Sequence, residues 1–286
     1  MTTLMYHDLV PAGAEDTSGF PGRDARLYKV SPQQFAAHLD AIRTSLSNLT
    51  HRPDEPNLRD LPDLPDRSDL PAPPGLPGPP GPVFTFDDGG VSAMRAADLL
   101  EARGFVGSFF VTANFIGTRG FVGKADVREL ARRGHIIGSH SCSHPLRMGH
   151  CSWPQLVDEW TRSRAILEGI LGTEVRVASV PGGDFAPQVA DAAAQAGMTT
   201  LFTSEPTRTT RSAFGLTLEG RFTIQTWTTV TAVAGLAAGD WLPCARQALV
   251  WNAKKVTKRI GGDRYLQLRK LVLRHGNEVR WGDQNY

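Results

Sequence analysis

Short apolar runs alternate with longer amphipathic stretches along most of the chain. Each run is short enough to be a buried strand, and the runs span residues 4–7, 83–86, 108–111, 135–139, 177–180, 200–203 and 222–226. Strands that are separated by helices usually pair in parallel and are joined by right-handed crossovers. The pattern therefore predicts a single α/β sheet or barrel.

The stretches between these runs carry the signals that begin and end helices. Ser31 and Ser152 are each followed by a Pro within two residues and by a Gln three residues on, as at a capped helix start. Beyond Ser31, apolar residues recur at helical spacing and should face the core: Phe35, Leu39, Ile42 and Leu46. Further helices are predicted at residues 91–103, 126–133, 152–171 and 187–196.

Two segments depart from this alternation. Residues 51–82 hold eleven of the twenty prolines, and proline both removes a backbone donor and restricts the residue before it. We expect an extended or partly disordered surface insertion there, with a docking role for its Leu-Pro steps as the alternative. Residues 242–259 and 263–274 have helical patterns separated by two glycines. The predicted organisation is a domain at 1–240 that contains the insertion, followed by a helical extension at 241–286.

The composition is that of an ordinary soluble globular protein, with 41% apolar and 21% charged residues. No run of eighteen apolar residues is present, so no membrane-spanning helix is expected. Residues 1–7 lack the basic start of a secretory leader. Three cysteines argue against a disulfide framework and favour a reducing compartment. We therefore expect a cytoplasmic protein.

The small net charge of +2 hides an asymmetry along the chain. Residues 242–286 contain ten Lys or Arg and three acidic residues, a net charge of +7, so the remainder carries −5. The first interpretation is the solvated face of amphipathic helices. The alternative is a basic tail that contacts phosphate or an anionic membrane surface. No nucleic-acid partner is expected.

Paired carboxylates follow the predicted strand at 83–86. Side chains of adjacent strand residues point to opposite faces, but Gly89 and Gly90 permit a turn that brings Asp87 and Asp88 into one pocket. One carboxylate could then hold a cation while the other accepts a proton. A plain turn with a helix cap is the alternative.

His140 and His144 follow the predicted strand at 135–139. Their spacing would place both rings on one face of a helical turn, and carboxylate and imidazole are ligands that suit Zn²⁺ and its first-row neighbours. Two unrelated surface histidines are the alternative. Cys142 and Cys151 raise the further possibility of a structural zinc knuckle, but they lack the usual Cys-x-x-Cys spacing and are interpreted as packing residues.

Three motifs in order, TFDDGG at 85–90, HSCSH at 140–144 and SVPGG at 179–183, resemble the polysaccharide deacetylase family, also called NodB-homology or carbohydrate esterase family 4. The likeness covers roughly residues 1–235. It implies an irregular (β/α) barrel of about seven parallel strands. It also implies that Asp88, His140 and His144 bind a divalent metal and that Asp87 is the catalytic base. Three protein ligands would leave a coordination position open for chemistry.

The resemblance implies a metal-dependent hydrolase that removes an N-acetyl group from an amino sugar or glycan. Zn is the first expectation for the metal, and Co, Mn or Ni also suit these ligands. A deformylase or cyclic-amide hydrolase on the same fold is one alternative. A carbohydrate-binding homologue without activity is another.

The sequence departs from the family pattern in two places. Many members carry an Arg at the position of Ser179, where it pairs with the catalytic Asp. Without that Arg, either Asp87 has fewer positive charges near it, or another group takes over the pairing. The family's late Leu-x-His, the source of its general acid, is missing after the last predicted strand, and the only late match ends at His275. Four further residues are expected to line the substrate groove: His7, Pro181, Gly182 and Gly183.

Overall fold

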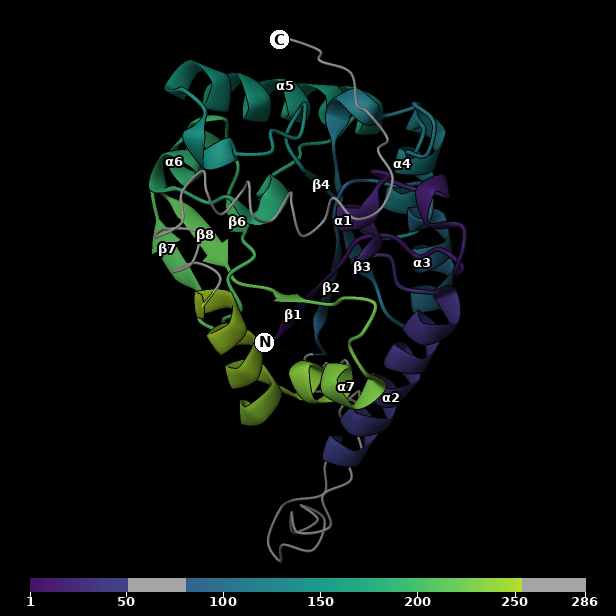
Figure 1. Cartoon of the computed structure of the whole chain (residues 1–286). Helices are drawn as coiled ribbons and strands as arrows, with labels where there is room; N and C mark the ends of the chain where they lie inside the picture. Colours follow the sequence, from purple (N-terminus) through teal and green to yellow (C-terminus); the bar gives the residue numbers. More distant parts are fainter. Residues whose placement is uncertain (51–80, 254–286) are drawn as a thin grey trace, which may run out of the picture.

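A single curled sheet organises the protein in the computed structural model, which describes residues 1–50 and 81–253 (Figure 1). The strand order is β7-β8-β6-β5-β4-β3-β2-β1-β9, and every neighbouring pair is parallel except β7 and β8. The strands are β1 Thr3–Tyr6, β2 Val83–Phe86, β3 Gly107–Val111, β4 Ile136–Ser139, β5 Val177–Ser179, β6 Thr200–Phe202, β7 Arg211–Ala213, β8 Leu216–Glu219 and β9 Phe222–Thr223.

Helices connect the parallel strands and cover the outside of the curled sheet (Figure 1). They are α1 Arg23–Arg26, α2 Pro32–Thr50, α3 Ala93–Glu101, α4 Lys124–Arg132, α5 Trp153–Leu171, α6 Pro187–Gln195 and α7 Val230–Ala238. The predicted core face of α2 is confirmed, because Phe35, Leu39 and Ile42 are fully buried. The capping box predicted at Ser152 is also present at the start of α5.

The two ends of the sheet meet at a step of two residues, Gly220 and Arg221. Glu219 of β8 pairs with Phe202, whereas Phe222 of β9 pairs with Leu4 at the far edge. The chain can pass so quickly from one edge to the other only if the sheet curls around. At Gly220 a Cβ would lie 2.6 Å from the carbonyl oxygen of Glu205, so this step requires glycine.

The parallel barrel predicted from the sequence is confirmed, with two corrections. The described residues form nine strands rather than about seven, because β7 and β8 were not predicted. β7 is short and exposed, and β8 alternates between buried and half-buried positions. Helix α7 was not predicted either, because its nine residues are almost uniformly apolar and give no clear helical periodicity.

An aromatic stack lies under the ends of β1, β2 and β3. The ring of Phe86 lies 5.6 Å from Tyr6 and 4.8 Å from Phe109, and Phe35 of α2 meets Phe86 edge-on at 5.7 Å. All four residues are buried, and such pairs add to the stabilisation that comes from burial. The ends of β1 and β2 are therefore supported by closely packed aromatic rings.

The C-terminal part of the described chain packs against the last strand. A helix begins at residue 241 and is described as far as residue 253. Its Gln247 accepts a hydrogen bond from the backbone N–H of Thr223 and donates one to the Thr223 carbonyl, both at 2.9 Å. The predicted boundary at residue 240 stays a prediction. Most of the Pro-rich insertion, the rest of the extension and His275 lie outside the described residues.

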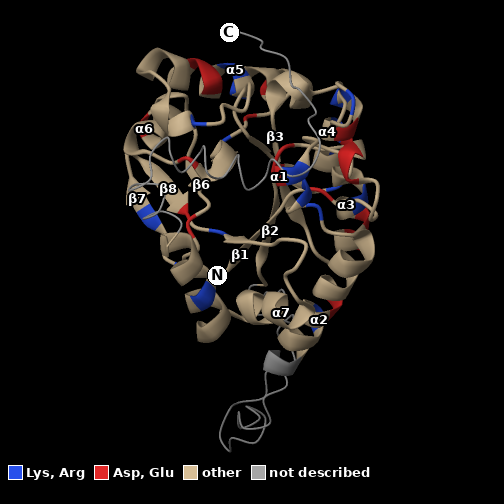
Figure 2. Ribbon diagram, in the orientation of Figure 1, with Lys and Arg blue, Asp and Glu red and all other residues tan. Residues whose placement is uncertain are grey.

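Acidic and basic residues are interspersed along α3, α4 and α5 (Figure 2). Arg133, just after α4, forms ion pairs of 2.7 Å with Asp98 and Glu101 of α3, which ties these two helices together. Among the helices of residues 1–50 and 81–253, none has both the length and the hydropathy needed to cross a bilayer.

Candidate metal centre

Asp87 and Asp88 leave the carboxyl end of β2, where the backbone turns sharply. Asp88 has φ 77° and Gly89 has φ 83°, in the left-handed region that residues other than glycine seldom adopt. The turn keeps both carboxylates buried at one end of the barrel. Gly89 serves the predicted purpose, and Asp88 shares its unusual conformation.

His140 and His144 meet one oxygen of Asp88. His140 Nε2 lies 3.3 Å and His144 Nε2 lies 3.5 Å from Asp88 Oδ1, and one ligand atom from each of the three residues lies within 4.8 Å of the others. Ligands about 2.0–2.1 Å from a tetrahedral Zn²⁺ are about 3.3–3.4 Å apart. The cluster therefore fits a first-row divalent ion.

The conformation of the histidine loop differs from the predicted helical turn. His140 directly follows β4, and residues 140–144 are not helical. Ser141 and His144 instead have φ values of 62° and 59°. The two rings converge because the loop reverses twice, with their centroids 5.1 Å apart, and not because the residues share a helix face.

The charge balance of the cluster favours a bound cation. Burial alone would raise the pKa of Asp88, but the adjacent imidazoles of His140 and His144 hold that pKa well below its usual value. Burial would lower the pKa of His144, but Asp88 outweighs this effect and raises it. Asp88 is thus kept ionised. Either a proton on an imidazole or a metal ion held between the three side chains can balance its negative charge.

Asp87 is paired with a buried arginine from the far end of the chain. Arg221 donates from Nη1 to Asp87 Oδ1 at 2.6 Å and from Nη2 to Oδ2 at 2.8 Å, a bidentate pair with both side chains almost fully buried. The guanidinium also lies 5.7 Å from the ring centroid of Phe110. Burial would raise the pKa of Asp87, but the charges of Arg221 and His140 lower it.

Arg221 supplies the positive charge beside Asp87 that many family members supply from the position of Ser179. The positive partner of Asp87 is present, but it comes from the step between β8 and β9 and not from position 179. Sequence reasoning missed this residue. The available signal was a lone arginine at the start of an apolar strand, directly after a glycine, where a buried charge needs a partner.

Ser179 links the two carboxylate environments. Its hydroxyl donates to Asp87 Oδ1 at 3.1 Å and lies 2.6 Å from His140 Nδ1, whose N–H it can accept. The Ser179 carbonyl oxygen is also 3.2 Å from the same ring nitrogen. This contact orients the His140 ring so that Nε2 faces Asp88.

The remaining predicted residues lie at the same end of the barrel. Tyr6 pairs with Phe86, so His7 follows β1 at the level where Asp87 follows β2. Pro181, Gly182 and Gly183 form the turn directly after Ser179 and Val180, with Pro181 buried and both glycines at positive φ. Their contact with substrate stays a prediction.

The two cysteines lie outside this cluster, in line with a packing role. Cys142 is buried, and its thiol lies 3.2 Å from Asn114 Oδ1. Cys151 is half-buried, with its nearest partner the Arg147 carbonyl at 3.9 Å. Neither thiol is among the ligand atoms that gather around Asp88.

A buried polar cluster fixes the loop that covers His144. Asp8 Oδ1 accepts hydrogen bonds from Ser18 at 2.6 Å and from Ser92 at 2.7 Å. The loop held in this way carries Phe20, whose ring centroid is 4.6 Å from that of His144. Packing by an aromatic ring therefore confines His144, whereas hydrogen bonds confine His140.

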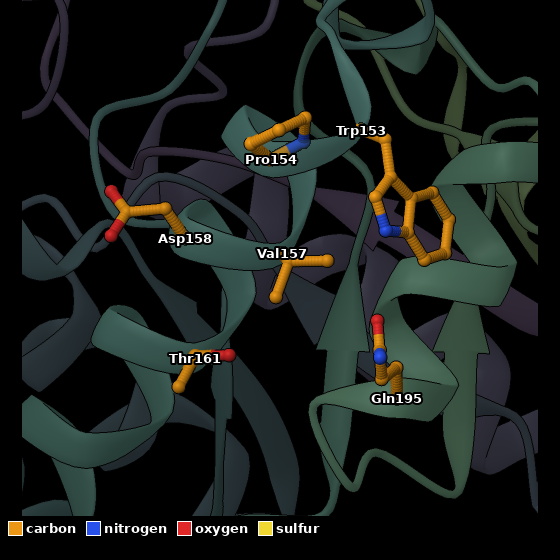
Figure 3. Close-up of a pocket in the computed structure, with 6 residues that line it drawn as sticks. All are labelled: Trp153, Pro154, Val157, Asp158, Thr161 and Gln195. Carbon is orange, nitrogen blue, oxygen red and sulfur yellow. The ribbon is translucent and has the colours of Figure 1, made fainter.

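A shallow depression of about 440 Å³ lies apart from the centre, between α5 and α6 (Figure 3). Trp153 and Gln195 lie on one side of it, and the carboxylate of Asp158 points away from Trp153. Its lining shares no residue with the Asp88 cluster or with Asp87. The convergent titratable groups, and not this depression, identify the candidate site.

The fold and the site together define an α/β barrel protein with a candidate metal centre at the carboxyl ends of its strands. Residues 78–201 match the family model of polysaccharide deacetylase. The matched segment contains all three motifs, and the match confirms the resemblance seen in them. No curated protein sequence matches the chain significantly.

Solved structures show the same fold. The Streptococcus pyogenes deacetylase PplD, solved in complex with acetate, aligns with a TM-score of 0.62 and 17% identity, over 83% of this chain and 97% of that chain. IcaB from Ammonifex degensii aligns with 0.57 and 21% identity, over 82% and 96%. A de-N-acetylase from Aggregatibacter actinomycetemcomitans aligns with 0.57 and 19% identity, over 82% and 98%. At these identities the likeness concerns the fold.

Proposed function

We propose that the protein is a metal-dependent hydrolase that removes the N-acetyl group from an amino sugar within a glycan. The observation that carries the proposal is the convergence of Asp88, His140 and His144 beside a second carboxylate, Asp87, that is held ionised by Arg221. The family membership of residues 78–201 supports the reaction type. Zn²⁺ is the first candidate ion, with Co²⁺, Mn²⁺ and Ni²⁺ as alternatives.

The ion would supply Lewis acidity, which polarises a carbonyl group and makes water a better nucleophile near neutral pH. Asp88, His140 and His144 would hold it. Asp87 would accept the proton of the attacking water, and its lowered pKa keeps it in the required ionised form. The amide C–N bond then breaks, and acetate and a free amine are released.

The leaving amine needs a proton, and an ionised Asp87 is poorly suited to provide one first. His7 is our candidate donor, because it follows β1 at the level of Asp87 and its ring packs against Tyr28 with centroids 4.7 Å apart. Within the described residues, its buried Nδ1 has no hydrogen-bond partner. In this proposal His7 takes the role of general acid, which the missing Leu-x-His motif leaves unassigned.

The test of the function is acetate release from N-acetylglucosamine oligomers by purified protein, together with elemental analysis. We expect about one divalent ion per chain, loss of acetate release after chelation, and recovery when metal is restored. Metal binding without acetate release from any oligomer tested would favour the carbohydrate-binding alternative. Release of formate instead from an N-formyl sugar would favour the deformylase alternative.

The role of His7 is tested by changing the leaving group. An aryl acetate releases a phenolate that needs no protonation, whereas an amide releases an amine that does. We expect His7→Gln to lower kcat on the amide by about 10²–10⁴-fold and to affect the ester far less, with metal content unchanged. Equal losses on both substrates would contradict a proton-donor role, and a change confined to KM would indicate a binding role.

A further inference from the structure

The loop that presents both histidines adopts a conformation that its own sequence does not favour. Ser141 and His144 have φ values of 62° and 59°, although neither is glycine. Such residues occur where surrounding contacts enforce the conformation. The groups that hold this loop therefore determine whether His140 and His144 can face the same oxygen of Asp88.

One carboxylate outside all three motifs makes three contacts with the middle of this loop. Glu159, on the second turn of α5, accepts hydrogen bonds at Oε2 from the backbone N–H groups of Cys142 and Ser143, both at 2.8 Å. Its Oε1 accepts from the Ser143 hydroxyl at 2.5 Å. These are the two residues between the left-handed positions, so Glu159 binds the middle of the reversal. Hydrogen bonds to an ionised acceptor are stronger than those between neutral groups.

The next turn of the same helix face holds the start of the loop. Ser163 lies four residues after Glu159, and its hydroxyl is 2.7 Å from that of Ser139, the last residue of β4. The Ser139 hydroxyl also accepts the N–H of Ser141 at 3.2 Å. One face of helix α5 thus forms hydrogen bonds both to the segment before His140 and to the segment before His144.

From these contacts we infer that Glu159 is a positioning residue of the metal centre, which keeps His140 and His144 preorganised before an ion arrives. The inference depends on the proposed function only in that a divalent ion binds at Asp88, His140 and His144. It does not depend on the substrate or on catalysis. Because Glu159 contacts the loop backbone and not the ion, its removal should weaken binding without removing a ligand.

The experiment measures Zn²⁺ and Co²⁺ affinity of the full chain by calorimetry and by the visible absorption of bound Co²⁺. We expect Glu159→Ala to weaken affinity by about 10- to 100-fold, as for other groups that orient metal ligands, and to alter the Co²⁺ spectrum. Glu159→Gln, which keeps one accepting oxygen, should lie between Ala and the wild type. Ser143→Ala, which removes one of the three bonds, should have the smallest effect.

Asp158→Asn is the matched control, because Asp158 is the neighbouring acidic residue and, among residues 1–50 and 81–253, its ion pair is with exposed Arg162 at 3.1 Å. It should bind metal as the wild type does. Thermal unfolding of each metal-free variant shows whether it folds. A folded Glu159→Ala variant with affinity within twofold of the wild type would overturn the inference, as would equal weakening by Asp158→Asn. A wild-type protein that binds metal but releases no acetate would refute the proposed function alone.

Discussion

Asp87 and Asp88 are neighbours in sequence, yet they lie in opposite electrostatic surroundings. Asp87 faces a permanent cation, Arg221, through two short hydrogen bonds inside the barrel. Asp88 faces two imidazoles, which are neutral unless they take up a proton. Both carboxylates are buried, so each must be compensated; Asp87 is compensated by a permanent charge, whereas Asp88 is compensated by two imidazoles.

This difference shows how one dipeptide can serve two purposes. A carboxylate with a fixed bidentate partner stays ionised, and in the proposed mechanism it would accept a proton without holding the ion. A carboxylate whose partners are imidazole nitrogens would instead share a metal ion with them. The turn at Asp88, with its φ of 77°, separates the two environments. Four predictions test this division, from the largest effect to the smallest.

Replacing Asp88 should have the largest effect. Asp88→Asn removes the only anionic ligand of the cluster, so we expect metal content to fall to background and acetate release to be lost. Elemental analysis of the purified variant and the oligomer assay measure the two effects. A variant that retained the ion with wild-type affinity would show that Asp88 is not a ligand.

Replacing Asp87 should separate activity from metal binding. We expect Asp87→Asn to retain the ion and to lose about 10²–10⁴-fold in kcat, the usual contribution of a general base. Metal content and kcat are measured on the same preparation, with thermal unfolding as a control because Arg221 loses its carboxylate. Turnover at the wild-type rate would remove Asp87 from the proposed mechanism.

Removing the guanidinium should expose how strongly the barrel depends on this ion pair. Arg221→Met leaves Asp87 buried without its partner, and we expect a loss of about 3–5 kcal/mol in the free energy of unfolding. Adding Asp87→Asn should recover much of that loss, since the double variant no longer buries an unpaired charge at position 87. Urea unfolding of the two single variants and the double variant measures the coupling. Additive losses would contradict a direct interaction.

Ser179→Ala should have the smallest effect, because each of its contacts has a substitute. Asp87 keeps Arg221, and His140 Nδ1 keeps the Ser179 carbonyl oxygen at 3.2 Å. We expect metal affinity to fall by no more than about tenfold, the lower end of the range for groups that orient a ligand. Calorimetric titration checks this. A loss as large as that of Asp88→Asn would mean that the hydroxyl, and not the carbonyl, fixes the ring.

The sequence predicted those features that depend on local pattern. The core face of α2 follows from the spacing of Phe35, Leu39 and Ile42, and the three motifs follow the strands that deliver them. The choice of Asp88, His140 and His144 as a ligand set came from the family resemblance, which places the three motifs at the ends of strands. The structure brings these three side chains together.

Features that depend on long-range packing were missed or described wrongly. Arg221 is 134 residues from Asp87, and no periodicity relates the two. Glu159 looks like any polar position on a helix until the loop it contacts is seen. The predicted helical turn at 140–144 was wrong because the tertiary contacts of that loop outweigh its local preference. The cytoplasmic location and the role of the basic tail stay predictions.

The two-residue step between β8 and β9 has a consequence for the nascent chain. A ribosome that has completed residue 215 has already produced all three motifs and the whole segment that the family model recognises. That chain still lacks the guanidinium of Arg221 and strand β9, which pairs with β1. Asp87 therefore gains its charged partner only when the chain returns to β1, and a product truncated before residue 221 would carry all three motifs but leave the Asp87 carboxylate without that partner.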